Sequence, residues 1–176
     1  MARAAKLDLR AFQRELATRL AAKTTAQVEQ SRLGLACAGN QWLIRLADAG
    51  EVLAVPPLAS VPLTKPWYLG VANIRGNLYG VIDFAGFLGR PLEPVTPGAS
   101  LTRMVLFGPR VGELHAGLIV HRVLGLRNLA ELAKSEAPAG APDWYGARWA
   151  ETNGDVWQEI DLARLAQDPA FLQVGL

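Results

Sequence analysis

The chain has few of the residues on which most catalytic and metal chemistry depends. Its 176 residues include one cysteine, Cys37, and two histidines, His115 and His121. A single cysteine excludes a disulfide within the chain and a cysteine-rich zinc site. No apolar run reaches the roughly 18 residues of a membrane-spanning helix, and residues 1–6 lack the apolar stretch of a secretory signal. We therefore expect a cytoplasmic protein that folds without a disulfide or a metal.

The chain also lacks a large excess of charge of either sign, and the charge is unevenly placed. It has 18 basic and 16 acidic side chains. Residues 1–32 hold seven of the basic and three of the acidic ones, which leaves 11 basic and 13 acidic residues for the rest. A folded domain that binds nucleic acid should carry a basic face. Nucleic-acid binding, with the basic arm as an electrostatic tether, is therefore a minor alternative.

Residues 1–35 form a basic N-terminal arm with the pattern of a helix. Asp8 is a candidate N-cap, and Leu9, Phe12, Leu16 and Leu20 recur at three- and four-residue spacing. A helix of this kind either packs on its own domain or docks into a groove of a partner. We favour packing on its own domain.

Beyond the arm, the pattern is that of many short strands separated by turns. Strands are predicted at residues 42–46, 51–55, 69–74, 78–84, 101–107, 116–123, 149–152 and 156–160, with short helices at 129–133 and 161–165 and a Gly- and Pro-rich connector at 89–100. We expect residues 51–55 to return on 42–46 as a hairpin, and Asn153-Gly154 to form a type I′ turn. This pattern favours a small β barrel or sandwich.

A weak internal repeat divides the chain into two halves. The segment Tyr79–Phe87 resembles Trp157–Leu165 at an offset of 78 residues, with Ile, Asp and Ala in the same places. The repeat predicts two related β lobes whose apolar faces are shared. Asp83 and Asp161 occupy the same place in each half, directly before a helical turn, and this favours capping over a catalytic carboxylate pair.

The candidate catalytic groups do not form a recognisable constellation. Neither a Gly-x-Ser-x-Gly nucleophile elbow nor a Gly-x-x-x-x-Gly-Lys-Ser/Thr phosphate loop occurs. We therefore predict a binding module without catalytic residues, metal site or cofactor. The alternative is a small-molecule-binding barrel or an enzyme that uses His121, Asp83 or Trp67, which would require an enclosed pocket where these side chains converge.

The stretch Leu69–Phe84 resembles the signature of the CheW-like coupling domain. The matching residues are Gly70, Val71, Asn73, Arg75, Gly76, Val81, Ile82 and Asp83. The resemblance covers roughly residues 36–170. It implies an all-β fold with minor helices, in which residues 36–176 form two five-stranded SH3-like barrels related by a pseudo-twofold axis, with strands interleaved between the halves. The arm adds an N-terminal helix.

This resemblance implies that the protein is an adaptor without enzymatic activity. Members of the family couple methyl-accepting chemotaxis receptors to a sensor histidine kinase, with one surface for the receptor tip and another for the kinase regulatory domain. Residues 64–70 and 78–80 are most similar to the branch that serves type IV pilus twitching motility, and a flagellar-type chemotaxis adaptor is the alternative. Such a protein is cytoplasmic, is recruited to membrane-associated receptor arrays without inserting into the membrane, and binds neither nucleic acid nor a cofactor.

The resemblance and the chemistry of the residues both point to one turn as a partner-binding site. The predicted site residues are Leu69, Gly70, Val71, Asn73, Arg75 and Gly76. A turn that ends in Gly76 can present Arg75 outward, where its planar guanidinium suits a protein interface. The alternative is that Arg75 only bonds a neighbouring carboxylate. The chain departs from the family pattern in having Gly80 where proline is usual, and in carrying the basic arm.

Overall fold

The structure is a computed structural model that describes residues 9–90 and 101–176. The candidate cap Asp8 and most of the connector 89–100 lie outside these residues. The helices are α1 (Leu9–Gln30), α2 (Phe84–Phe87), α3 (Leu162–Leu165) and α4 (Pro169–Leu172), and the 3-10 turns are η1 (Pro109–Val111) and η2 (Leu129–Glu131). The strands are β1 (Ser31–Cys37), β2 (Asn40–Arg45), β3 (Ala49–Ala54), β4 (Tyr68–Ile74), β5 (Asn77–Asp83), β6 (Arg103–Phe107), β7 (Ala116–Val120), β8 (Arg122–Asn128), β9 (Ala133–Ser135), β10 (Tyr145–Ala150) and β11 (Val156–Ile160).

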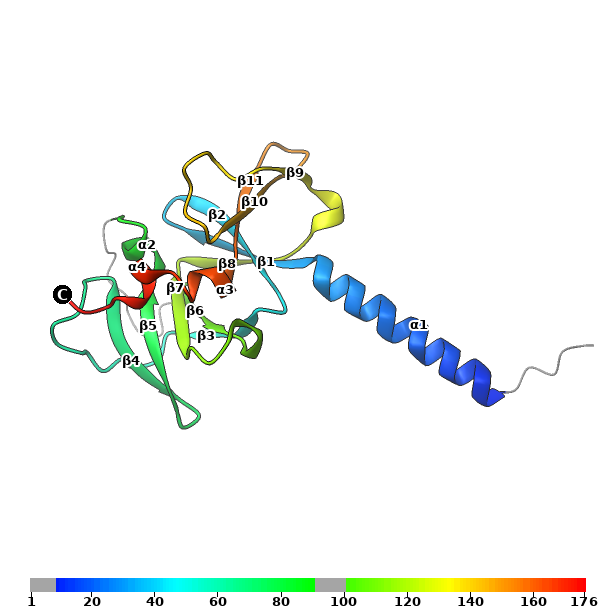
Figure 1. The fold of residues 1–176 in the computed structure, drawn as a ribbon, viewed down its shortest axis with the longest axis horizontal. Coiled ribbons are helices and arrows are strands. Elements are labelled where there is room, and N and C mark those ends of the chain that lie inside the picture. The colour runs from blue at the N-terminus through cyan, green and yellow to red at the C-terminus, as the bar shows by residue number, and fades with distance from the viewer. Residues whose placement is uncertain (1–8, 91–100) are drawn as a thin grey trace, which may run out of the picture.

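The strands form two sheets, each the frame of one lobe (Figure 1). Lobe A has the strand order β8-β1-β2-β11-β10-β9, and lobe B has the order β3-β6-β7-β5-β4. Each lobe therefore combines strands from both halves of the chain. The predicted all-β fold with two small lobes is confirmed, and β9 is a short addition to lobe A.

The internal repeat is visible in the hydrogen bonds of the backbone. In lobe B, β5 pairs antiparallel with β4 and parallel with β7; in lobe A, β11 pairs antiparallel with β10 and parallel with β2. The N–H of Asp83 donates to the carbonyl of Trp67 at 2.8 Å, and that of Asp161 to Trp144 at 2.9 Å. Both aspartates also cap the short helix that follows, as predicted.

Two turn predictions are wrong. The strand β3 does not return on β2, because it crosses to the other lobe and pairs with β6. The β10–β11 connection is not a two-residue turn: the N–H of Gly154 donates to Glu151 and that of Glu151 to Asp155, so five residues form the loop. Gly154 has a φ of +93°, whereas Asn153 is not among the residues with positive φ, and a type I′ turn needs positive φ at both positions.

The faces of the two sheets share one apolar core. Its fully buried members from β1, β2, β7 and β11 include Leu35, Ile44, Leu118 and Ile160, and Phe84 joins them from α2. Each lobe also has a smaller core of its own, around Trp157 in lobe A and around Met104 in lobe B. Because one cluster of buried residues includes strands of both sheets, the lobes form one unit.

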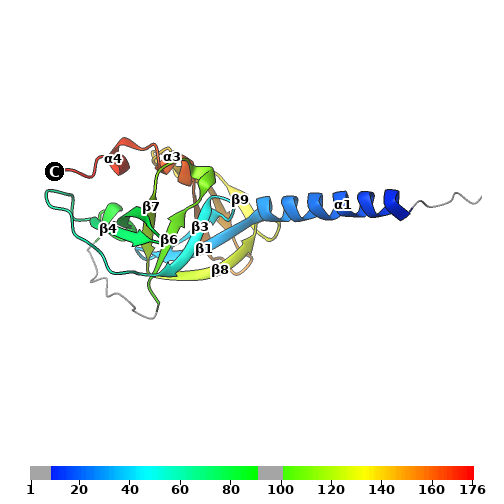
Figure 2. The ribbon, with the colours of Figure 1, turned by 90° about the horizontal axis from the view of Figure 1, so that it is seen from below.

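Helix α1 projects away from both lobes as a separate rod (Figures 1 and 2). The prediction that it packs on its own domain is therefore wrong. Its root is nevertheless fixed: Arg32 donates to the carbonyl of Glu29 at 2.6 Å and to Oε1 of Glu159, in β11, at 2.6 Å. A basic side chain on the last carbonyls stabilises a helix C-terminus. No helix within the described part of the chain is long and apolar enough to cross a membrane.

Candidate partner-binding site

The six predicted site residues lie in β4 and in the turn that joins β4 to β5. This hairpin, green in Figure 1, ends in a tip that projects from lobe B. Asn73, Arg75 and Gly76 at the tip are exposed, whereas Gly70 at the inner end of β4 is buried. Leu69 and Val71, on either side of Gly70, are half-buried. The structure therefore places the polar half of the site on the surface and the apolar half partly within the lobe.

The tip is a two-residue turn with an unusual first position. Arg75 has a φ of +53° and Gly76 a φ of +88°, as a type I′ turn requires. The amide side chain of Asn73 stabilises the turn by accepting the N–H of Gly76 at 2.9 Å. Asn77, which lies between the predicted strands at 69–74 and 78–84, is the first residue of β5.

The backbone of Arg75 is strained at this position. A residue with a Cβ atom costs about 1–2 kcal/mol in the left-handed region, and glycine or asparagine would avoid much of that cost. Strained residues that persist are enriched at functional sites. The conformation of Arg75 thus favours a role that depends on its side chain.

The guanidinium of Arg75 bonds one carboxylate and stays open to solvent. Its Nη2 lies 2.8 Å from Oε1 of Glu51, in β3, and the two side chains are 77% and 41% exposed. Exposed ion pairs contribute about 0–1 kcal/mol, so Glu51 orients Arg75 but does not hold it away from a partner. Sequence reasoning missed Glu51, because 24 residues separate the pair and no local pattern joins them.

The inner residues of the site have contacts within the chain. A Cβ atom on Gly70, whose φ is +124°, would overlap the carbonyl oxygen of Ala59. Val71 exchanges two backbone hydrogen bonds of 2.9 Å with the same Ala59, and Leu69 packs against the inner core of lobe B. At Gly70 the chain itself therefore occupies the space that a side chain would need, whereas the space around Gly76 is open.

The family usually has proline at position 80, and the structure shows why glycine fits here. A Cβ atom on Gly80 would lie 3.1 Å from Oη of Tyr68. The N–H of Gly80 donates to the carbonyl of His115 at 2.9 Å, a bond that proline could not make. The tyrosine side chain thus occupies the space that a larger residue would need.

Two side chains of the enzyme alternative, Asp83 and Trp67, make contacts that belong to the fold. Oδ1 of Asp83 accepts the N–H groups of Ala85 and Gly86 at the start of α2, and Trp67 packs edge-on against Phe87 at 5.2 Å. No group of three His, Cys, Asp or Glu side chains in the described residues could hold a metal ion.

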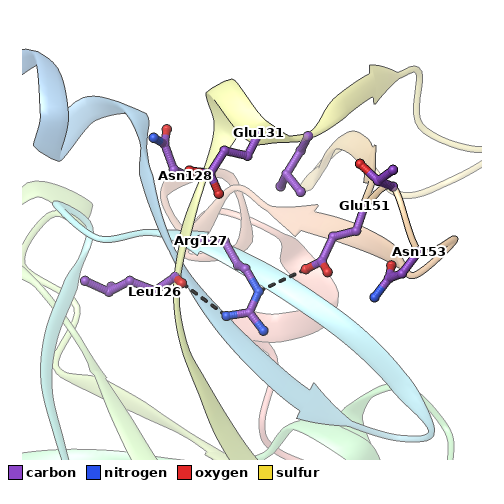
Figure 3. Close-up of a pocket in the computed structure, with 8 residues that line it drawn as sticks. Leu126, Arg127, Asn128, Glu131, Glu151 and Asn153 are labelled. Atoms are coloured by element: carbon purple, nitrogen blue, oxygen red, sulfur yellow. Dashed lines mark hydrogen bonds and ion pairs between the residues drawn. The ribbon is translucent and has the colours of Figure 1, made fainter.

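A shallow pocket of about 480 Å³ lies on lobe A, between β8 and the β10–β11 loop (Figure 3). Arg127 fills its floor, with Nε 3.0 Å from Oε1 of Glu151 and Nη1 3.1 Å from the carbonyl of Leu126. The guanidinium also lies 4.8 Å from the centre of a Trp157 ring. Because these contacts satisfy the charged groups on the floor, nothing in this pocket suggests acid–base or nucleophilic chemistry.

Comparison with known proteins agrees with the fold. A family model described as the CheW-like domain matches residues 32–170. Protein PilI of Pseudomonas aeruginosa is 36% identical over 169 residues, covering 93% of this chain and 90% of PilI. A probable chemotaxis protein CheW of Rhizobium etli is 26% identical over 103 residues, covering 58% of this chain and 63% of that protein.

The crystal structure of the scaffolding protein TtCheW from Thermoanaerobacter tengcongensis has the same fold. It superposes with a TM-score of 0.65 at 18% identity, covering 81% of this chain and 95% of TtCheW. Helix α1 ends at Gln30 and lies outside the family match. The family match over residues 32–170 and the similarity to PilI show that this chain belongs to the CheW-like family, in its PilI-type branch.

Proposed function

We propose that this protein is an adaptor without enzymatic activity that couples a methyl-accepting chemotaxis-type receptor to a sensor histidine kinase. The pathway would be the chemosensory one that controls type IV pilus twitching motility. The protein would act in the cytoplasm and be recruited to membrane-associated receptor arrays. The similarity to PilI supports the pilus branch over the flagellar one.

The observation that carries this proposal is the presentation of Arg75. The side chain is 77% exposed, stands on a strained turn at the tip of a projecting hairpin, and belongs to the part of the chain that the family model matches. An arginine can make several directed hydrogen bonds through its planar fork and pack its stem on apolar surface. The exposed Leu78, 60% accessible, offers such an apolar neighbour on the same hairpin.

An adaptor of this kind works by proximity. Binding two partners at once makes their encounter effectively intramolecular and raises the concentration of each near the other. Each single contact needs only a modest affinity, since an array repeats the contact many times. Arg75 with Asn73 and Gly76 would bind one partner, and a separate surface would bind the other.

Affinity capture from cell extract tests the proposal. The full chain should recover a methyl-accepting receptor and a large sensor histidine kinase, identified by mass spectrometry. Arg75→Glu should lose one of them while the thermal melt stays nearly unchanged, because the replaced side chain is exposed. Arg122→Glu, which makes the same charge change at an exposed position of β8, is the matched control and should retain both.

Two results would oppose this function. Capture of neither protein class by the wild-type chain would contradict coupling. A collapsed melt of Arg75→Glu would make Arg75 a structural residue, and the site would then have to lie elsewhere.

A further inference from the structure

Helix α1 has no neighbour in the fold along most of its length. It leaves lobe A at β1 and extends away from both lobes in both views (Figures 1 and 2). Its 22 residues make a rod about 33 Å long. Most helices in proteins owe their stability to the packing of an amphipathic face. A helix of this length that stands free therefore raises the question of what its apolar face meets.

The apolar face of α1 belongs to its distal half, residues 9–20. Leu9, Phe12, Leu16 and Leu20 follow one another at spacings of three, four and four residues, which places them on one face of the helix. We call these four residues the distal stripe. The residues between them at 13–15 and 17–19 are polar or alanine and are exposed. The distal half is therefore amphipathic.

The root half of α1, residues 21–30, does not continue this face. The same spacing leads from Leu20 to Lys23 and then to Gln27, so the line of apolar positions becomes polar. The ten residues of the root half rise about 15 Å along the axis. The root half is thus a spacer that holds the distal stripe away from the lobes.

Helix α1 lies outside the common domain of the family but is shared with PilI. The CheW-like family model begins at residue 32, beyond the end of the helix. The match with PilI covers 93% of the chain. The remaining 7% is too short to contain all of residues 1–30, so most of α1 lies within the match. This distribution favours a role for the helix that the two lobes do not supply.

The charge around the distal stripe favours an acidic partner. Glu15 is already paired with Arg19 at 2.6 Å, whereas the guanidinium of Arg14 has no partner among the residues that the structure describes. Two copies of this segment would bring like charges together, which disfavours self-pairing. The chain up to residue 20 holds five basic and two acidic side chains: Arg3, Lys6, Arg10, Arg14 and Arg19 against Asp8 and Glu15.

The width of the distal stripe favours a helix as the occupant. The stripe has about one apolar residue per turn, and such a narrow stripe is typical of the seam between two helices. A helix that lies on a membrane buries a broad apolar face, and here Arg19 and Lys23 stand close to the line of the stripe. A single partner helix is therefore favoured over a lipid surface.

We propose that residues 9–20 of α1 bind an acidic amphipathic helix of a partner protein. The distal stripe packs against the apolar stripe of that helix, and carboxylates of the partner lie beside the arginines of α1. Because the spacer separates this contact from the lobes, the helix can be occupied while the turn at Arg75 binds elsewhere. The contact adds an attachment point to the adaptor and does not depend on the surface around Arg75.

Fluorescence anisotropy of the full chain with a labelled synthetic helix tests the proposal. The probe is a peptide of about 28 residues with leucine at every a and d position and glutamate at e and g; its counterpart has lysine at e and g. The chain should bind the glutamate peptide more tightly than the lysine peptide. Leu16→Gln should weaken binding about tenfold or more, because it removes one apolar residue from the seam.

Ala17→Gln is the matched control, because it introduces the same side chain at the next position, which is exposed and outside the distal stripe. It should bind the glutamate peptide as the wild type does. Both variants should keep the melting temperature of the wild type, since α1 packs on neither lobe. Arg75→Glu should also bind the peptide normally, so a failure at the turn and a failure at the helix are separate results.

Four results would overturn the proposal. The first is equal or absent binding of the two peptides. The second is an equal loss of affinity in Leu16→Gln and Ala17→Gln. The third is a dimer of the full chain in sedimentation velocity that Leu16→Gln dissociates, which would assign the distal stripe to a second copy. The fourth is flotation with phosphatidylglycerol vesicles that Leu16→Gln abolishes, which would assign the stripe to a membrane.

Discussion

Gly70 and Ala59 approach each other so closely that no side chain fits between them. A Cβ atom on Gly70 would overlap the carbonyl oxygen of Ala59 and also crowd Ser60. The φ of Gly70, +124°, is in addition one that residues with a Cβ atom rarely adopt. This contact brings the segment before β4 against the hairpin that carries Arg75.

We expect Gly70→Ala to lower the free energy of unfolding by about 2–4 kcal/mol, from backbone strain together with forced displacement of a neighbouring backbone. Urea unfolding followed by tryptophan fluorescence measures the loss. Gly76→Ala is the matched control: its φ is +88° but no atom lies within 4 Å of the added carbon, so it should cost only about 1–2 kcal/mol. Equal losses in the two variants would show that the contact with Ala59 contributes nothing.

Arg75→Asn should separate stability from binding. Asparagine tolerates the left-handed region better than arginine, but the variant loses the weak ion pair between Arg75 and Glu51. The net effect should be a rise of about 1 kcal/mol in the free energy of unfolding. Capture of a partner should fall at the same time. The comparison is thermal melting and affinity capture on the same preparations. A variant that is less stable than the wild type would mean that the side chain of Arg75 supports the fold.

The pair of Arg32 and Glu159 should be strongly coupled. Their side chains are only 10% and 13% exposed, and Glu159 also accepts the indole N–H of Trp149 at 3.2 Å. Glu159→Ala leaves the guanidinium without its anion, and removing one partner of a buried pair costs about 3–5 kcal/mol. Chemical denaturation of Glu159→Ala, Arg32→Met and the double variant measures the coupling. The sum of the losses of unfolding free energy in the two single variants should exceed the loss in the double variant. If the sum equals the loss in the double variant, the prediction is contradicted.

Regular alternation and turn residues were enough to predict most of the strands. The segments at β2, β5, β7 and β11 were found because each has a buried face and an adjacent turn signal. β1 was missed, although β7, which is buried along its whole length, was predicted. β1 begins with Ser31-Arg32 and has only small residues besides Leu33 and Leu35, so it lacks the apolar run that marks β7. β9 has three exposed residues and exists only because β10 lies beside it.

The long-range relations of the fold could not be predicted from local patterns. Nothing in residues 49–54 indicates that this strand leaves its neighbour for the other lobe, since period-two alternation specifies a strand but not its partner. The repeat between Tyr79–Phe87 and Trp157–Leu165 did indicate two lobes. It missed the equivalent Trp67-Tyr68 and Trp144-Tyr145, which the backbone bonds to Asp83 and Asp161 make clear.

The part of the candidate site that could be predicted is the part whose residues lie close together in the sequence. Asn73, Arg75 and Gly76 form one turn, so a local motif was sufficient to locate them. That Arg75, and not Asn77, has a positive φ follows from the register of the hairpin and has no local signal.

Two tyrosines should make the fold less stable at high pH. Burial raises the pKa of the Tyr68 and Tyr145 phenols above their ordinary value of 10.0. The folded state therefore keeps these protons at pH values where the unfolded chain releases them. Their contribution to the free energy of unfolding is fully present below pH 10 and declines as the pH rises from there through the folded-state pKa values.

Urea unfolding between pH 8 and about 11.5 measures this decline, and the variant Tyr68→Phe with Tyr145→Phe isolates it. All lysines are common to both proteins, so the difference between their slopes reports the two phenols. The variant should lose less stability over this range than the wild type. If unfolding free energy falls with pH equally in the wild type and the variant, both phenols titrate alike in the folded and unfolded chains. The two tyrosine side chains are then more hydrated than their packing against Gly80 and Trp42 implies.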